Sequence, residues 1–315
     1  ILPGGKIIEL DKNNIKDVKE QDGNVYKIFA MEGLEKGCEI EYYYTFKRPV
    51  SYFGREVMQG NIPELKSIFQ IIAPDRLRFD IKSYNFDLTP TDTVINNRRI
   101  TQCTLDATAG IDEEKYANYQ ANLRRIDFKL SYNDLTRKGE RLFTWNEMAK
   151  RIFAVYTYYS DKETRKIADM VTENGWDKLG DEVAKITAVE SYVKNKYSYN
   201  EDLDSDEGNS LSGVIKNKIG GTIGTIRLYS AIFQHLGINF QFVLTGHRDK
   251  FIIDKAFENW NNCDNPLIYF PSEGKFIAPT RPDYRYPWIL PSWAEQTDFS
   301  ANALCSVITQ QPLPK

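Results

Sequence analysis

Hydrophobic and polar residues alternate along the first 130 residues, and this period of two predicts β-strands. Aromatic and β-branched residues fill the apolar positions, and turn signals such as Asp22-Gly23-Asn24 separate the runs. Strands at this spacing favour an antiparallel β-sandwich over residues 1–144. The expected strands are KIIEL (6–10), VYKIFAM (25–31), CEIEYYYTF (38–46), SIFQIIAP (67–74), LRFDIKSYN (77–85) and RIDFKLSYN (125–133).

After Trp145 the apolar positions recur every three or four residues, which predicts helices. Ser160 and Glu163 form a capping box at the start of one of them. A helical half followed by strands is typical of an α+β domain, predicted over 145–290 and expected to pack on the sandwich. The tail 291–315 is either a tail or the start of a further β domain, through its apolar run at 302–308. The expected helices are 145–159, 160–176, 181–200 and 222–236, and the expected strands are 239–248, 266–271 and 274–279.

Composition supports a folded chain of two domains. The 315 residues are 41% hydrophobic and 13% aromatic, enough for packed cores. The most apolar stretch, 232–244, is interrupted by polar residues, so no membrane span is expected. A net charge of -3 gives no electrostatic reason to expect nucleic acid or an anionic membrane as a partner. The chain begins at Ile1 rather than Met, which is compatible with a removed leader or a preceding domain.

Cysteine and histidine usage narrows the chemistry. The four cysteines, at 38, 103, 263 and 305, form no CxxC pair, which argues against a zinc knuckle or a thioredoxin-type redox site. Scattered buried thiols are the simpler interpretation. There are two histidines, His235 and His247, so any histidine-dependent mechanism must use one of them.

The stretch KIGGTIGTIRLYSAIFQHLGI, 218–238, predicts a glycine entry, a helix with an apolar face and a Gly237 stop. Thr222 stands at the helix start. Free N–H groups and the positive end of the helix dipole lower the pKa of a thiol placed there and stabilise an oxyanion. The position suits a cysteine nucleophile, yet the chain has a threonine, whose structural role would be to cap the helix.

This order of elements resembles the transglutaminase-like domain of the papain-type fold. On the family pattern, Gly220 occupies the glycine place and Thr222 the cysteine place, counted back from Leu236-Gly237-Ile238. The Asp place falls on Ala278, counted from Ala278-Pro279-Thr280, and the His place falls within 262–266, at Asn265. The N-terminal KGCEIEYYYTF and ANLRRIDFKLSY, and the later APTRPDYRYPWILP, resemble the β-sandwich of unknown function that precedes such domains in secreted bacterial proteins.

The resemblance implies a catalytically inactive transglutaminase-like protein, because a triad reading Thr, Asn and Ala has neither thiol nor base. It further implies a periplasmic or cell-surface binding or scaffold module for a peptide, protein or cell-surface glycan, and no cofactor. Two alternatives stay open. One is a hydrolase or acyltransferase of the cysteine-protease fold that uses Thr222 or Cys263 with His247; the other is a structural spacer in a longer polypeptide.

Other signals are weaker. Trp260, Cys263, His247, Tyr284 and Trp288 are candidates to line a binding groove, although such aromatics also serve to hold domains together. IGGTIG lacks the Lys-Ser/Thr of a phosphate loop.

An acidic stretch gives a weak calcium candidate. Asp202, Asp204 and Asp206 alternate as at the start of a calcium loop, but Glu207 and Gly213 stand where an EF-hand needs Gly and Glu. A solvated acidic loop is therefore the preferred interpretation.

Overall fold

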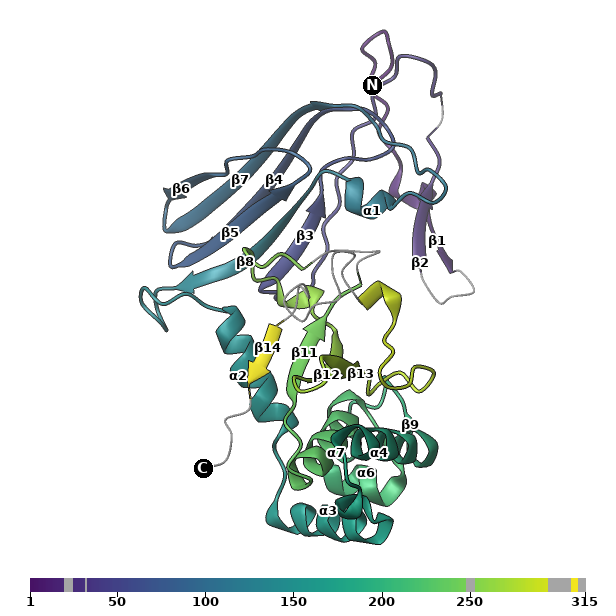
Figure 1. Cartoon of the computed structure of the whole chain (residues 1–315). Helices are drawn as coiled ribbons and strands as arrows, with labels where there is room; N and C mark the ends of the chain where they lie inside the picture. The colour runs from purple at the N-terminus through teal and green to yellow at the C-terminus, as the bar shows by residue number, and fades with distance from the viewer. Residues whose placement is uncertain (20–24, 32, 248–252, 294–306, 311–315) are drawn as a thin grey trace. The chain divides into compact units, whose positions relative to one another are not determined.

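The first fifty residues form a unit of their own. The computed structural model describes residues 1–19, 25–31, 33–247, 253–293 and 307–310, and the chain divides into the compact units Ile1–Val50 and Ser51–Lys315. In the first unit a short 3₁₀ turn, η1 (Lys12–Asn14), precedes the antiparallel pair β1 (Ile15–Lys19) and β2 (Val25–Phe29) (Figure 1). β2 confirms the strand predicted in VYKIFAM.

The strands predicted over 6–10 and 38–46 are wrong, because neither segment has strand structure. The second contains three consecutive tyrosines, and Tyr42, Tyr43 and Tyr44 are 68%, 94% and 69% exposed. Strand propensity reflects how well a side chain fits a half-buried pleated surface. With neither face of 38–46 buried, the aromatic composition alone does not produce a strand.

Two antiparallel three-stranded sheets open the second unit and pack face to face. Phe69 of one stacks on Phe128 of the other at 5.5 Å between ring centroids, above a small core that includes Met58, Cys103 and Ile126. The strands predicted at 67–74, 77–85 and 125–133 are confirmed. The sheets are, in strand order, β3 (Phe53–Val57), β8 (Arg125–Asn133) and β5 (Leu77–Tyr84), and β4 (Glu64–Pro74), β7 (Arg98–Thr108) and β6 (Thr91–Ile95), with the short helix α1 (Tyr119–Asn122) before β8.

Helices take over at Trp145, where the sequence predicts the change. Two helices begin with a capping box in which both hydrogen bonds are present. Thr144 pairs with Glu147 in the first, and Ser160 pairs with Glu163 in the second, as predicted. None of the described helices is long and apolar enough to cross a membrane. The helical elements are α2 (Trp145–Tyr156), α3 (Asp161–Asn174), η2 (Trp176–Lys178), α4 (Glu182–Lys196), α5 (Asp206–Asn209), α6 (Leu211–Asn217), α7 (Thr222–His235), η3 (Trp260–Asn262) and η4 (Pro291–Trp293).

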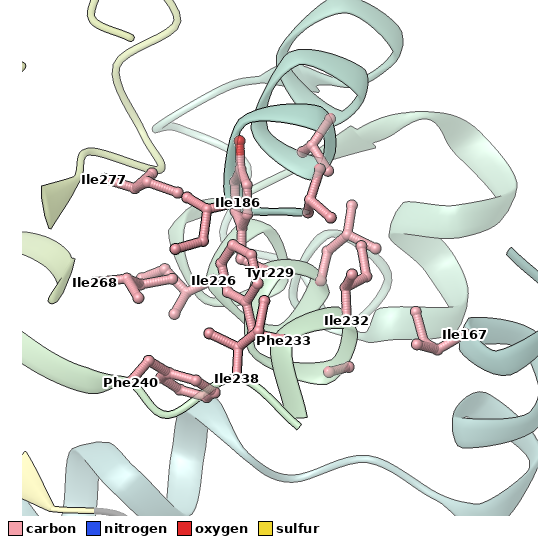
Figure 2. Packing of buried hydrophobic residues seen from close by; sticks show 14 of the residues in the cluster. Ile167, Ile186, Ile226, Tyr229, Ile232, Phe233, Ile238, Phe240, Ile268 and Ile277 are labelled. Atoms are coloured by element: carbon pink, nitrogen blue, oxygen red, sulfur yellow. The ribbon is translucent and has the colours of Figure 1, made fainter. Parts of the chain in front are cut away.

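Helix α7 is the centre of the largest core. Its residues Ile226, Tyr229 and Phe233 are fully buried and belong to one packed cluster with Ile186 of α4 and the sheet residues Ile268 and Ile277 (Figure 2). Each such side chain contributes about 1.5–3 kcal/mol of burial free energy. A helix buried on most of its surface has little freedom to shift, so the position of its first residue is fixed.

The sheet beside α7 has the order β13–β12–β11–β14, all antiparallel. The edge strand β14 (Val307–Gln310) overlaps the apolar run predicted at 302–308 and joins this sheet; the other tail residues from 294 lie outside the described residues. The domain limits of 144 and 290 stay a prediction. The other strands of the sheet are β11 (Gln241–Thr245), β12 (Asn265–Phe270) and β13 (Lys275–Ile277).

Charged side chains on β8 join the paired sheets to the segment 253–264. Lys129 is completely buried, and its ammonium lies 2.6 Å from the carboxylate of Glu258. Asp127, 1% exposed, accepts two hydrogen bonds from Arg55, at 2.7 and 2.8 Å, and a third from the Asn259 amide at 3.1 Å. Buried charges are tolerated only when paired, so these contacts fix where the segment lies.

We predict that this junction weakens in acid. Burial alone would raise the pKa of Glu258, but hydrogen bonds from Arg141 and Lys129 outweigh it and lower that pKa. A carboxylate whose folded-state pKa is lowered adds stability above its unfolded pKa, and this stability is lost as the pH falls through the folded-state value. The free energy of unfolding, measured by urea titration, should therefore fall from about pH 5 downward.

The variant Glu258→Gln should lose up to about 3 kcal/mol at pH 7, because it leaves the buried Lys129 charge without its carboxylate. It should also flatten the pH dependence below pH 5. Glu173→Gln, on the exposed face of α3, is the matched control and should change neither. An equal acid slope in wild type and Glu258→Gln would contradict this role.

Candidate functional site

Two short strands and two glycines lead into α7. β9 (Ser198–Tyr199) and β10 (Ile219–Gly220) pair in parallel, and the extended Gly221 is the N-cap. A Cβ on Gly221 would lie 2.2 Å from the carbonyl oxygen of Leu203, and one on Gly224 would lie 2.2 Å from that of Gly208. Only glycine allows such close backbone approach. The loop before the helix is therefore closed tightly around the helix start.

Thr222 is the first residue of α7, and it is half-buried. Its Oγ1 lies 3.1 Å from the hydroxyl of Tyr199. The prediction that Thr222 caps the helix is wrong, because Gly221 occupies the cap position and makes no side-chain cap bond. Thr222 is already part of the helix, and its hydroxyl is hydrogen-bonded to the hydroxyl of Tyr199 rather than to a backbone N–H of the first turn.

A second tyrosine lies near this pair. Burial, with a smaller contribution from the nearby Tyr199, raises the pKa of Tyr156 to about 12. A general base for a hydroxyl nucleophile works best with a pKa near the operating pH. Tyr156 therefore stays protonated at neutral pH and cannot accept a proton from Thr222.

Neither histidine is placed to serve Thr222. His235 ends the same helix, thirteen residues on, which at 1.5 Å per residue is about 20 Å along the axis. The ring of His247 stands edge-on to Trp293, with 6.1 Å between centroids. Trp293 packs on the sheet face formed by Val243 and Leu267, whereas α7 packs on the opposite face. His247 thus lies on the face opposite α7.

Asn265 and Ala278, the positions that the family resemblance assigns to the histidine and the aspartate, lie on that opposite face. Asn265 pairs directly with Thr245, whose hydroxyl donates to the Trp293 carbonyl, and the Asn265 amide donates to Asp264 at 2.7 Å. Ala278 is fully buried against Trp293 and its neighbours. Successive strand residues point to opposite faces. Asn265 and Ala278 therefore lie on the same face of the sheet, opposite the face on which α7 packs.

Cys263 and Trp260 lie on the α7 side. Cys263 is 6% exposed and packs with Met148, Leu244 and Ile253. Trp260 stacks on Phe53 of β3 at 5.9 Å between centroids, so it does join the sheets to this domain. The thiol of Cys263 is part of an apolar cluster rather than of a polar catalytic group.

An apolar pocket of about 250 Å³ opens beside the start of α7. Ile223 forms one wall, Trp260 another, and α2 supplies the remaining lining residues, Met148, Arg151, Ile152, Val155 and Tyr156. Sequence reasoning missed this pocket, and it also missed Tyr199. The pairing of β9 with β10, which brings Tyr199 to Thr222, has no signal in a two-residue strand.

Tyr284 and Trp288 belong to a different part of the surface. The buried Glu190 accepts from the Tyr286 backbone N–H, and Lys194 donates to the Tyr284 carbonyl, so this segment is held on α4. Trp288 is 73% exposed. Neither Tyr284 nor Trp288 lines the apolar pocket.

The acidic loop has local hydrogen bonds. Asp204 accepts from the Asn209 side-chain amide at 2.7 Å, and Asp206 opens the short helix α5. Asp202 is exposed. Among the described residues, no group of three or more His, Cys, Asp or Glu side chains is placed to hold a metal ion.

The fold and this helix start define a mixed α+β domain of the transglutaminase and cysteine-protease type. Family profiles agree: residues 165–278 match the transglutaminase-like superfamily, and residues 1–111 match DUF3857, a domain of unknown function. The chain is therefore a DUF3857 domain followed by a transglutaminase-like domain. No curated protein matches it in sequence.

Three solved structures resemble the chain. A candidate protease from Parabacteroides distasonis is 14% identical, with a TM-score of 0.50 over 88% of this chain and 55% of that one, so this chain spans about half its length. A candidate cysteine protease from Cytophaga hutchinsonii is 14% identical, with a TM-score of 0.32 over 82% and 84%. A transglutaminase is 12% identical, with a TM-score of 0.27 over 69% and 50%. The first likeness supports the fold alone.

We predict that Thr222 and Tyr199 are coupled by their hydrogen bond. In a double-mutant cycle, Thr222→Val and Tyr199→Phe should show an interaction free energy of about 0.5–1.5 kcal/mol in urea unfolding. Thr222→Ser, which keeps the hydroxyl, is the control and should retain the coupling. Additive effects of the two substitutions would contradict the assignment.

Proposed function

We propose that this chain is a catalytically inactive transglutaminase-like protein that binds an extended peptide segment beside the start of α7. The location of Thr222 is the observation that carries the proposal. Its hydroxyl is hydrogen-bonded to Tyr199, whose side chain replaces the base that a nucleophile would need. His247 lies on the opposite sheet face.

The apolar pocket supports peptide binding at the same place. Its walls are mainly carbon, from Met148, Ile152, Val155 and Ile223, and its 250 Å³ suits one large apolar side chain. Methionine adapts to ligands of differing shape. Arg151 at the edge favours an acidic residue next to the apolar one. The ligand class is thus a peptide with an aliphatic or aromatic anchor beside an acidic residue.

An open pocket argues against the spacer alternative. In a spacer we would expect the chain's own side chains to fill the groove at the helix start, whereas about 250 Å³ stays open beside Ile223. The proposed location, periplasmic or cell-surface, rests on the family resemblance. A peptide-binding role there would need no cofactor.

Peptide binding should depend on the pocket. Peptides selected from a random phage-displayed library on the wild-type chain should share an apolar residue, and Val155→Arg should weaken their binding at least about tenfold by filling the pocket with a charge. The Val155 carbonyl, which accepts from Arg227, is retained in this variant. Ala154→Arg, one residue away and exposed, is the control and should bind normally.

After incubation with the wild-type chain, the same peptides should have unchanged masses when measured by mass spectrometry. Their cleavage or transamidation by wild type, abolished in Thr222→Ala or Cys263→Ser, would overturn the non-catalytic proposal in favour of the hydrolase or acyltransferase. If none of the selected peptides bound more weakly to Val155→Arg than to wild type, the proposal that the apolar pocket binds a peptide would be contradicted.

A further inference from the structure

A second pocket, of about 240 Å³, lies on the other side of the segment that carries Trp260. Its polar lining side chains come from β3, from the residues after β11 and from the turn before β12. They are Arg55, His247, Asn259, Asn261, Asn262 and Asp264. Nothing in the proposed peptide site uses this pocket, and it does not share a lining residue with the apolar one.

The pocket is held in shape by buried contacts. Asp127, behind the wall, holds Arg55 in a two-pronged ion pair and accepts from the Asn259 amide. Asn259 is itself 4% exposed, and its side-chain oxygen accepts from the Asn261 backbone N–H at 3.1 Å. A preformed wall of this kind lowers the ordering cost of binding.

A glycine brings the opposite wall close. A Cβ on Gly246 would lie 2.4 Å from the carbonyl oxygen of Asn262. The turn with Asn261 and Asn262 therefore packs directly on the end of β11, where His247 follows. The amide side chains of the turn are presented to the pocket by backbone packing, not by a loose loop.

Charge selects the ligand class. Asp127 neutralises Arg55, and Asp264 adds a carboxylate at the edge, so an anion would meet no net positive charge. A cation would face the Arg55 guanidinium. The side-chain amides of Asn261 and Asn262 offer donors and acceptors, and Asp264 offers acceptors, which matches a ligand whose groups both donate and accept. Hydroxyl groups have this property at every oxygen.

We propose that this pocket binds a sugar unit, as a neutral polyhydroxylated ring, independently of the peptide site. Planar amide and carboxylate groups can each pair with two neighbouring hydroxyls of such a ring. The pocket volume corresponds to about eight water molecules at ~30 Å³ each, enough for one ring and too little for a long chain. The site thus accepts a single sugar, free or at the end of a glycan.

Saturation-transfer NMR with D-glucose, D-galactose, D-mannose and N-acetyl-D-glucosamine at millimolar concentration tests the proposal. At least one should bind, and Asn261→Ala and Asp264→Ala should each weaken it about tenfold, as expected for one or two lost hydrogen bonds. Both side chains are exposed, so folding should survive. Asn195→Ala, an exposed asparagine on α4, is the matched control and should leave binding unchanged.

Methyl glycosides of the same sugars distinguish the two sources. If they bind as well as the free sugars, the pocket takes the end of a glycan; if only the free sugars bind, it takes a monosaccharide, and either result supports the proposal. Failure of every sugar overturns it, as does binding that is unchanged in both pocket variants. Binding of acetate, phosphate or N-acetylglycinamide at this pocket in place of any sugar would also overturn it.

Discussion

The buried charged face of β8 is the constraint on which the rest of this structure depends. Asp127 and Lys129 are almost completely removed from water, and unpaired charges at such depth would cost several kcal/mol each. Asn259 and Glu258, their partners on the segment 253–264, therefore have to stay in contact with β8. These paired charges, together with the stacking of Trp260 on Phe53, join the paired sheets to the transglutaminase-like domain.

Both pockets follow from that junction. The segment held by β8 presents Trp260 to the apolar pocket and its asparagines to the polar one. On the other side of the apolar pocket, the buried body of α7 fixes Ile223 and Thr222. In an enzyme this frame would hold a thiol and an imidazole together. Here it holds a threonine with a tyrosine, and the two pockets beside this frame are the surfaces at which we propose binding.

Periodicity predicted much of the fold, because burial on one face produces the patterns used. The helices predicted at 145–159 and 222–236 and the strand predicted at 125–133 follow from it. The strand predicted at 38–46 was wrong because aromatic residues usually mark half-buried strands, whereas Tyr43 in this segment is exposed. The contact between Tyr199 and Thr222 was not predictable from the sequence, because it depends on the pairing of two strands of only two residues each. Arg125, Asp127 and Lys129 alternate along β8 and are all buried, so β8 is buried on both faces. Charged residues usually mark a solvent-exposed face, and the sequence pattern therefore did not predict this second buried face.

The central claim is that no imidazole serves the start of α7, and thiol reactivity measures this directly. In Thr222→Cys, the alkylation rate with iodoacetamide should be followed against pH, with the wild-type rate subtracted. The account predicts one titration with a pKa near or modestly below 8.5, set by the helix N-terminus alone. A thiolate that stays reactive with a pKa of about 3–4, as for a cysteine paired with histidine, would contradict it.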